Sequence, residues 1–337
     1  MAKRKTVAAK RREALVQKKI EKKRGTRSVP ERGEGVLLKE QLEEIGFAGG
    51  YLGIAACDST NDFLKTLSQS MIAKELGKTT SILQTPTFRD NPEEWLNRLF
   101  LPKDLPFVIT ADEQTAGRGR QNNTWWTGHG SLALSMLLDA KKHGLTPQTS
   151  AQLSLAIGYA AMTALRAITE ETLAKSKTAT KIESNGESDL MPNIEIRWPN
   201  DVYVNDRKIV GILIEAPNMR HLVIGIGINT NNTAADAPEE IRERIVTLRD
   251  VLGQEIDQRR MIFLLCREIM AVLQYFPLQL PQFIEQVEQN LHQVGKMVNI
   301  SREGDTISGQ CLGLNSDGSL RVLTETGEKA VVSGVTI

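Results

Sequence analysis

Four β-rich runs follow one another between residues 194 and 228, and the short links between them restrict how they can pair. The runs are Ile194–Trp198, Val202–Val204, Lys208–Glu215 and His221–Ile228. Turn-forming residues such as Pro199, Asn205 and Pro217 occupy the links, which are too short for the crossover that parallel neighbours need. Short links favour antiparallel hairpins. We therefore predict an antiparallel or mixed sheet with helices, which is an α+β fold.

The segments on either side of this meander supply further strands and helices. Apolar runs predict strands at Tyr51–Ala55, Pro106–Asp112 and Ser131–Leu138. Helices are expected after Asp58–Asn61, with Phe63, Leu64, Leu67 and Met71 on one face, at Ala151–Ile168, and between Pro238 and His292. Residues 83–105, interrupted by prolines, and the polar residues 173–193 are predicted to be insertions.

The C-terminal residues 293–337 have a different rhythm of short strands and turns. Strands are predicted at Lys296–Ser301, Thr306–Gly313, Leu320–Thr324 and Ala330–Val335. Turn signals such as Asn315–Gly318 separate them. This pattern is typical of a small SH3-like β-barrel. We therefore divide the chain into residues 1–39, a larger domain at 40–292 and a barrel at 293–337.

The N-terminal segment is strongly basic. Residues 1–32 carry 13 Lys or Arg against 3 Asp or Glu, whereas the rest of the chain carries 29 against 38. Because residues 1–39 contain few large apolar side chains, we predict a disordered tail, with ordered structure beginning near Glu40. A nucleic-acid contact through residues 1–33 is the alternative interpretation, since clustered Lys and Arg neutralise phosphates.

The composition argues against several classes of protein. No apolar run approaches the ~18 residues of a membrane span, and the N-terminus lacks the apolar core of a signal peptide. The cysteines Cys57, Cys266 and Cys311 are far apart, and the four histidines show no ligand spacing, which disfavours a zinc site or a disulfide framework. These features favour a reduced cytoplasmic protein that does not insert in a membrane.

The segment Gln114–Arg120 is the strongest chemical signal in the chain. Its glycines Gly117 and Gly119 allow a ligand to approach the backbone, and its arginines Arg118 and Arg120 suit phosphate or carboxylate. The loop lacks the Gly-Lys-Ser/Thr ending of a Walker A loop and the third glycine of a dinucleotide fingerprint. A polar surface turn with solvated arginines is the alternative interpretation.

Four other segments are individually weaker. Asp58–Asn61 is typical of a helix N-cap but could also present hydroxyl and amide groups to a ligand. Arg197–Asp201 predicts a turn, and Lys208–Glu215 contains a glycine that often marks close approach of a ligand. Gly225–Asn229 could be a tightly packed core strand.

In this order and spacing, the five segments resemble the signatures of the biotin–protein ligases. The matching residues are Asp58-Ser-Thr-Asn61, Gly117-Arg-Gly-Arg120 with Trp125, Arg197-Trp-Pro-Asn-Asp201, Lys208-Ile-Val-Gly-Ile-Leu-Ile-Glu215 and Gly225-Ile-Gly-Ile-Asn229. The resemblance covers well over half of the chain. It implies a class II synthetase-like α+β catalytic domain at 40–292 and a C-terminal SH3-like barrel.

The resemblance also implies a reaction and a set of site residues. Biotin, as substrate, would be activated by ATP with Mg²⁺ to biotinyl-5′-AMP, and then joined to a lysine of a biotin carboxyl carrier protein. The implied biotin contacts are Ser59, Thr60, Asn61, Gln114, Arg118, Gly119, Arg120 and Arg197. The implied nucleotide contacts are Arg120, Trp125 and Asn229, and Arg120, Arg197 and Lys208 are the implied catalytic residues. The metal would be held through the ATP phosphates and not by a dedicated protein site.

Two positions depart from the family pattern. The turn usually opens with Lys, but Arg197 stands here, and arginine keeps the charge without being able to lose its proton at neutral pH. Arg197 should therefore serve if the position only stabilises charge. Asn123 stands where many bacterial members carry a third arginine, and we interpret it as variation.

Three other functions remain as alternatives. A lipoate or octanoate ligase or transferase would share the fold, a biotin-responsive regulator would use the basic tail on nucleic acid, and a biotin sensor would bind without turnover. The segment before the catalytic region lacks the apolar spacing of a winged-helix domain. Family members often form homodimers, but the sequence does not indicate whether this chain does.

Overall fold

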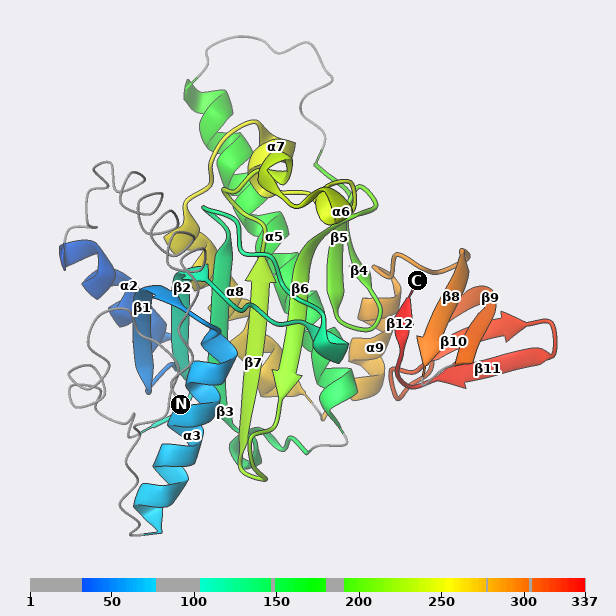
Figure 1. Cartoon of the computed structure of the whole chain (residues 1–337), viewed down its shortest axis with the longest axis horizontal. Helices are drawn as coiled ribbons and strands as arrows, with labels where there is room; N and C mark the ends of the chain where they lie inside the picture. Colours follow the sequence, from blue (N-terminus) through cyan, green and yellow to red (C-terminus); the bar gives the residue numbers. More distant parts are fainter. Residues whose placement is uncertain are drawn as a thin grey trace, which may run out of the picture. The chain divides into compact units, whose positions relative to one another are not determined.

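The predicted meander forms one side of a seven-stranded sheet (Figure 1). Its strands are β4 (Ile194–Arg197), β5 (Asp201–Val204), β6 (Arg207–Glu215) and β7 (His221–Ile228). The other strands are β1 (Gly50–Cys57), β2 (Phe107–Gln114) and β3 (Leu132–Asp139), in the order β1-β2-β3-β7-β6-β5-β4. Only β1 and β2 pair in parallel. The prediction of an antiparallel or mixed sheet is confirmed, and the sheet is mixed.

The structure is a computed structural model that describes residues 32–76, 104–146, 149–179, 191–276, 278–302 and 305–336. The chain divides into two compact units, residues 1–40 and 41–337. Residues 32–40 form the first part of helix α2 (Arg32–Glu44), so the prediction that ordered structure begins near Glu40 is wrong. Leu38 and Leu42 are buried and lie four residues apart on this helix, among charged residues. A four-residue spacing of apolar residues is typical of a helix. The remainder of the predicted tail lies outside the described residues.

Helices cover both faces of the sheet (Figure 1). Helix α3 (Thr60–Glu75) packs against β2, β3 and β7, whereas α5 (Ser150–Ala179) packs against β4 and β6 on the opposite face. Helix α8 (Gln258–Tyr275) lies along α5. The remaining helices of the described residues are α6 (Glu239–Arg242), α7 (Leu248–Leu252) and α9 (Leu280–Glu288), with short 3-10 turns at Arg120–Asn122, Lys141–His143 and Ala234–Asp236.

Helix α5 corrects one predicted boundary. Residues 173–193 were predicted to be a surface insertion, but the helix continues to Ala179. Its last turns carry good helix formers such as Leu173, Ala174 and Lys175, and Ser176 exchanges hydrogen bonds with Gln254 at 2.9 and 3.2 Å. Residues 180–190 lie outside the described residues, as does most of the other predicted insertion, 83–105.

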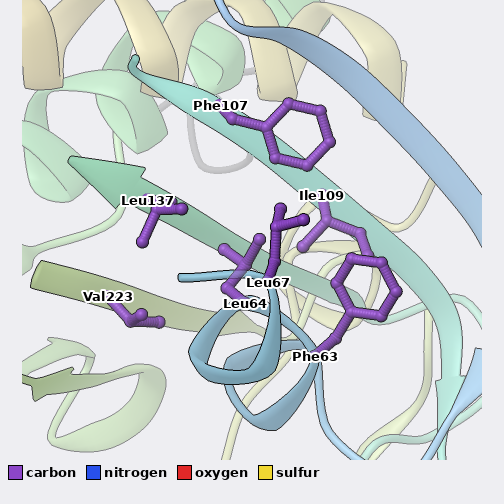
Figure 2. Close-up of a cluster of buried hydrophobic side chains, with 7 residues drawn as sticks. All are labelled: Phe63, Leu64, Leu67, Phe107, Ile109, Leu137 and Val223. Atoms are coloured by element: carbon purple, nitrogen blue, oxygen red, sulfur yellow. The ribbon is translucent and has the colours of Figure 1, made fainter. Parts of the chain in front are cut away.

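A buried apolar cluster fixes α3 on the sheet (Figure 2). Phe63, Leu64 and Leu67 of the helix meet Phe107, Ile109, Leu137 and Val223 of three strands. Each buried side chain of this size contributes roughly 1.5–3 kcal/mol. The predicted apolar face of the helix is therefore confirmed, with Met71 partly buried at its edge. The packing brings the start of α3, capped by Ser59 through the amide of Asp62, to the end of β2.

The C-terminal strands form a separate five-stranded sheet, as expected for an SH3-like barrel. The strands are β8 (Met297–Arg302), β9 (Asp305–Leu314), β10 (Leu320–Thr324), β11 (Gly327–Val331) and β12 (Val335–Thr336), in the order β11-β10-β9-β8-β12. The barrel contacts the larger sheet at the turn after β4, where the Trp198 indole Nε1 donates to the Gly318 carbonyl at 3.1 Å.

The last predicted strand, Ala330–Val335, is wrong because two strands occupy it. β11 pairs with β10, whereas β12 pairs with β8 at another edge of the sheet. Gly334 stands between them with a φ of +159°, where a Cβ would meet Ile300 Cγ2 at 2.4 Å. A glycine in this conformation lets the chain change strand partner. Within the described residues, no helix is long and apolar enough to cross a membrane.

Candidate active site

A cavity lies where α3, the Gly-rich loop after β2 and the turn after β4 meet strands β6 and β7. It is lined by all of the residues proposed from the sequence except one: Ser59, Thr60, Asn61, Gln114, Arg118, Gly119, Arg120, Trp125, Arg197 and Lys208. Motifs separated by up to 149 positions therefore share one cavity, because the sheet order places β6 and β7 beside the loop that follows β2.

Asn229 is the predicted residue that does not line the cavity. It follows β7, is only 1% exposed, and accepts a hydrogen bond from the Asn232 side chain at 3.1 Å. Its backbone amide donates to the Ile209 carbonyl at 3.0 Å. The side chain therefore holds the loop after β7, and its place beside a nucleotide pocket stays a prediction.

Glycines on β6 and β7 leave the cavity floor bare for the Trp125 indole. A Cβ on Gly227 would lie 2.2 Å from Trp125 Cε2, and one on Gly211 would lie 2.7 Å from Cζ3. The two glycines are direct partners across the ladder between β6 and β7. Lys208 also lines the cavity, and its Nζ lies 5.7 Å from the centroid of the indole. Close approach to the sheet thus explains the glycines in both strand motifs.

One group of lining residues belongs to a hydrogen-bonded set of neutral polar groups. Gln114 Oε1 accepts from the Thr60 amide at 2.9 Å and from its hydroxyl at 3.1 Å. Ser135 Oγ donates to Asn61 Oδ1 at 2.6 Å and lies 2.7 Å from Thr60 Oγ1. Ser135 was missed from the sequence because every other residue of its strand, β3, is apolar as far as Leu138. Its burial in β3 holds the start of α3 in register with the sheet.

Beside these groups, an ion cluster ties the Gly-rich loop to α3 and β6. Arg118 Nη2 lies 2.8 Å from Asp62 Oδ1 and 2.6 Å from Glu215 Oε2, and Lys65 Nζ lies 2.9 Å from Glu215 Oε1. Burial alone would raise the pKa of Glu215, but hydrogen bonds from Arg118, Asn61 and Lys65 outweigh it and lower that pKa. Glu215 is therefore an ionised carboxylate that holds Arg118 in place.

Replacing Glu215 with glutamine should destabilise the protein by about 1–2 kcal/mol at pH 7, because it leaves Arg118 and Lys65 with one carboxylate fewer. A carboxyl group whose pKa is lowered by folding contributes stability above its unfolded pKa of about 4.3 and loses it as pH falls through the folded value. The difference in free energy of unfolding between the wild type and Glu215→Gln, measured with urea, should therefore shrink below about pH 4.3. The exposed Glu325→Gln is the matched control, and a pH-independent difference would contradict the argument.

A second group of lining residues is cationic. Arg120 Nη1 donates to Asn200 Oδ1 at 3.2 Å, and burial lowers the pKa of Arg120 despite the opposing charge of Asp201. Lys208 Nζ pairs with Asp201 Oδ2 at 2.8 Å. The guanidinium of Arg197 lies over the Tyr203 ring, 4.7 Å from its centroid. The turn that contains Asn200 and Asp201 was predicted from the sequence. No individual role was predicted for these two side chains or for Tyr203.

Two guanidinium groups thus face the cavity without an ion pair to a carboxylate of the described residues, those of Arg120 and Arg197. Arg118 and Lys208 are already paired. Arginines held in this way favour the binding of carboxylate or phosphate groups, since their planar forks donate two parallel hydrogen bonds. The arrangement suits a reaction in which two anionic reactants must be brought together.

Two family models match the chain over the two parts that carry these features. The biotin/lipoate A/B protein ligase family matches residues 83–229, and the biotin protein ligase C-terminal domain matches residues 294–335. The chain belongs to the biotin protein ligase family. The first match contains the Gly-rich loop and strands β4 to β7, and the second contains the C-terminal barrel. The resemblance found in the sequence is confirmed.

Individual biotin protein ligases agree with this assignment. The bifunctional ligase/repressor BirA of Bacillus spizizenii is 29% identical over 238 residues, which cover 67% of this chain and 64% of the relative. The biotin--[acetyl-CoA-carboxylase] ligase of Mycobacterium tuberculosis is 26% identical, over 67% of this chain and 75% of the relative. The chain therefore spans slightly less than two thirds of the first relative's length.

A solved biotin protein ligase has the same fold. The structure from Aquifex aeolicus in complex with biotin and ATP superposes with a TM-score of 0.60 and 26% identity, over 85% of this chain and 97% of that one. The predicted α+β fold with a C-terminal SH3-like barrel is confirmed. In the part of the chain that the structure describes, no group of three or more His, Cys, Asp or Glu could hold a metal ion.

Proposed function

We propose that this chain is a biotin protein ligase that activates biotin with ATP and attaches it to a lysine of a biotin carboxyl carrier protein. The observation that carries the proposal is the pair of guanidiniums without ion-pair partners, Arg120 and Arg197, in a cavity that neutral polar side chains also line. Biotin has the matching polarity, with a neutral ureido ring at one end and a carboxylate at the other.

In the first step, a carboxylate oxygen of biotin attacks the α-phosphorus of ATP. A phosphorus–oxygen bond forms, the bond to the departing pyrophosphate breaks, and biotinyl-5′-AMP results. Arg120 and Arg197 would offset the charge of the two approaching anions, and Lys208 would add a cation near the phosphate. No protein nucleophile is needed, so the site acts by orientation and by electrostatics.

In the second step, the neutral amine of the acceptor lysine attacks the acyl carbon of the mixed anhydride. An amide bond forms, AMP leaves, and the amine proton passes to the solvent or to the leaving phosphate. Arg197 cannot give up its proton at neutral pH, so its role is to stabilise charge and not to carry a proton.

The predicted site residues divide between the two groups of lining residues. Ser59, Thr60 and Gln114 would contact the ureido ring of biotin, with Arg118 and the Gly119 backbone closing over it. Asn61 has its amide engaged by Ser135, Leu213 and Glu215, so we assign it to holding α3 and not to direct contact. Trp125 would shield the adenylate from water.

Magnesium would be held mainly by the ATP phosphates. Among the described residues, Asp201 supplies one cavity-facing carboxylate whose Oδ1 is buried and lacks a partner, which fits one protein ligand beside phosphate and water oxygens. When bound, the cation would offset phosphate charge.

We also propose that residues 40–292 are the catalytic domain, that residues 293–337 are the barrel, and that the enzyme works in the cytoplasm.

Incubation of the full chain with ATP, Mg²⁺, biotin and a biotin carrier domain tests this function by carrier mass. We expect the carrier to gain one biotin, with no gain when ATP is omitted or when lipoate replaces biotin. Pyrophosphate release without carrier modification would contradict the proposed acceptor. Absence of both products with biotin, or modification by lipoate, would overturn the proposed function.

A further inference from the structure

Tyr203 lies under the guanidinium of Arg197. It is not among the proposed contacts with biotin or with the nucleotide. Arg197 Cζ is 4.7 Å from the centroid of the phenol ring. In the β4–β5 hairpin Arg197 pairs with Asp201, and Glu195 pairs with Tyr203. Arg197 and Tyr203 are therefore diagonal neighbours on one face of two paired strands, within reach of each other's side chains, and both line the cavity.

A ring under the flat face of a guanidinium leaves its donors free. The cation–π attraction uses the face of the group, whereas its N–H bonds point outward in the plane of the fork. No carboxylate of the described residues is in ion-pair contact with Arg197, in contrast to Arg118 and Lys208. The ring therefore fixes the position of Arg197, and although the Tyr203 hydroxyl engages one donor of the guanidinium, the other donors stay available to an anion.

The Tyr203 ring is itself held by contacts with other residues of the fold. Its centroid lies 5.5 Å from that of His292, with the two rings inclined by 30°. His292 Nδ1 in turn lies 3.0 Å from Glu195 Oε2, and Tyr203 pairs with Lys208 in the β5–β6 ladder. Because these contacts come from three strands and from the last residue of the larger domain, Tyr203 is a fixed platform and not a loop residue.

We propose that Tyr203 is a positioning residue that holds Arg197 by its face, so that the edge of the guanidinium is aimed at the carboxylate of biotin. The proposal rests on the proposed function and deepens it. It also accounts for the arginine at position 197, where the family usually has lysine. A planar cation uses the ring as a platform and still donates two parallel hydrogen bonds, whereas an ammonium group presents a point charge. Arg197 and Tyr203 thus act as a pair.

A double-mutant cycle tests the pair. The wild type, Tyr203→Leu, Arg197→Lys and the double variant are compared in pyrophosphate release as the biotin concentration is varied. We expect Tyr203→Leu to raise KM for biotin and to lower kcat/KM about tenfold, within the range of desolvated cation–π contacts. In the Arg197→Lys background the same change should cost less than about twofold. Equal losses in both backgrounds would show that Tyr203 does not act through Arg197.

Two further variants separate the ring from general damage. Tyr203→Phe keeps the platform, so its loss should be clearly smaller than that of Tyr203→Leu, and equal losses would overturn the role of the ring. Tyr159 lies outside the cavity, where its ring meets that of Phe283 edge-on at 5.5 Å. Tyr159→Leu should lower the melting temperature while leaving kcat/KM unchanged. If it lowers kcat/KM as much as Tyr203→Leu, the effect at 203 is one of stability.

Thermal stability measures the contact between Arg197 and Tyr203 independently of turnover. The melting temperatures of the four proteins in the cycle are compared without substrates. Non-additive shifts are expected, because each single variant already removes the stack. Additive shifts would overturn the proposal whatever the enzyme does. If the wild type releases no pyrophosphate, the proposed function fails, and the melting temperatures still decide whether Tyr203 holds Arg197.

Discussion

Replacing Arg120 with alanine should lower kcat/KM for the formation of biotinyl-5′-AMP by about 100-fold or more, the range observed when one preorganised charge-stabilising donor is removed. The guanidinium lines the cavity, and among the contacts of the described residues it is anchored only by a 3.2 Å hydrogen bond to Asn200. Its positive charge is therefore available to the two anions that must meet in the first step.

Burial strengthens this expectation. Desolvation lowers the pKa of Arg120, which means that its charge is poorly solvated and interacts strongly with an anion that enters the same space. The loss should fall on both KM for biotin and kcat, because the carboxylate is bound before the reaction and its charge is shared with the phosphate during it. Arg120→Lys should recover part of the loss, since it keeps the charge but not the fork.

Pyrophosphate release at varied biotin concentration measures the effect. Arg207→Ala, at an exposed position on β6 outside the cavity, is the matched control and should change kcat/KM by less than about twofold, as expected for a surface substitution. An Arg120→Ala protein that forms the adenylate at the wild-type rate would remove Arg120 from the proposed chemistry.

The strands of the larger sheet were predictable because their patterns are local. Alternating and continuous apolar runs, bounded by short turns, indicated β4 to β7 within one or two residues of their observed ends. Two of the corrected strand and helix ends have local physical causes. Gly334 divides the last run through a positive φ, and α5 continues into a polar segment whose residues favour a helix.

The site was predictable only in part, because its residues meet through strand register. The glycines and arginines of the motifs pointed to the cavity, but Ser135 is a lone polar residue in an apolar strand whose role depends on Asn61 lying opposite. The pairing of Arg197 with Tyr203 follows from the offset of a two-strand ladder, which the sequence does not state. The contact of the Asn229 side chain with Asn232 after β7 is likewise a feature of the folded chain that the motif does not indicate.

Replacing Gly227 with alanine should displace Trp125 from the sheet and lower the formation of biotinyl-5′-AMP by about 100-fold, the scale expected when a catalytic site is misplaced by about 1 Å. The added methyl would lie 2.2 Å from Trp125 Cε2 and 2.4 Å from Nε1, distances that real Cβ contacts do not reach. The strand cannot move aside to relieve this contact. Gly227 is paired on one side with Ala133 of β3 and on the other with Gly211 of β6.

The indole must therefore leave, and the fold should survive because the sheet itself is unchanged. Acrylamide quenching of tryptophan fluorescence should increase in Gly227→Ala, with Trp125→Phe used to assign the signal, while pyrophosphate release falls. Gly158→Ala adds the same methyl on α5, where the nearest atoms are 3.7 and 3.8 Å away, and it should be neutral or stabilising by up to about 1 kcal/mol. A Gly227→Ala enzyme with normal turnover and an unchanged indole would mean that the floor under Trp125 can yield, and that close contact with the bare sheet is not what the reaction requires.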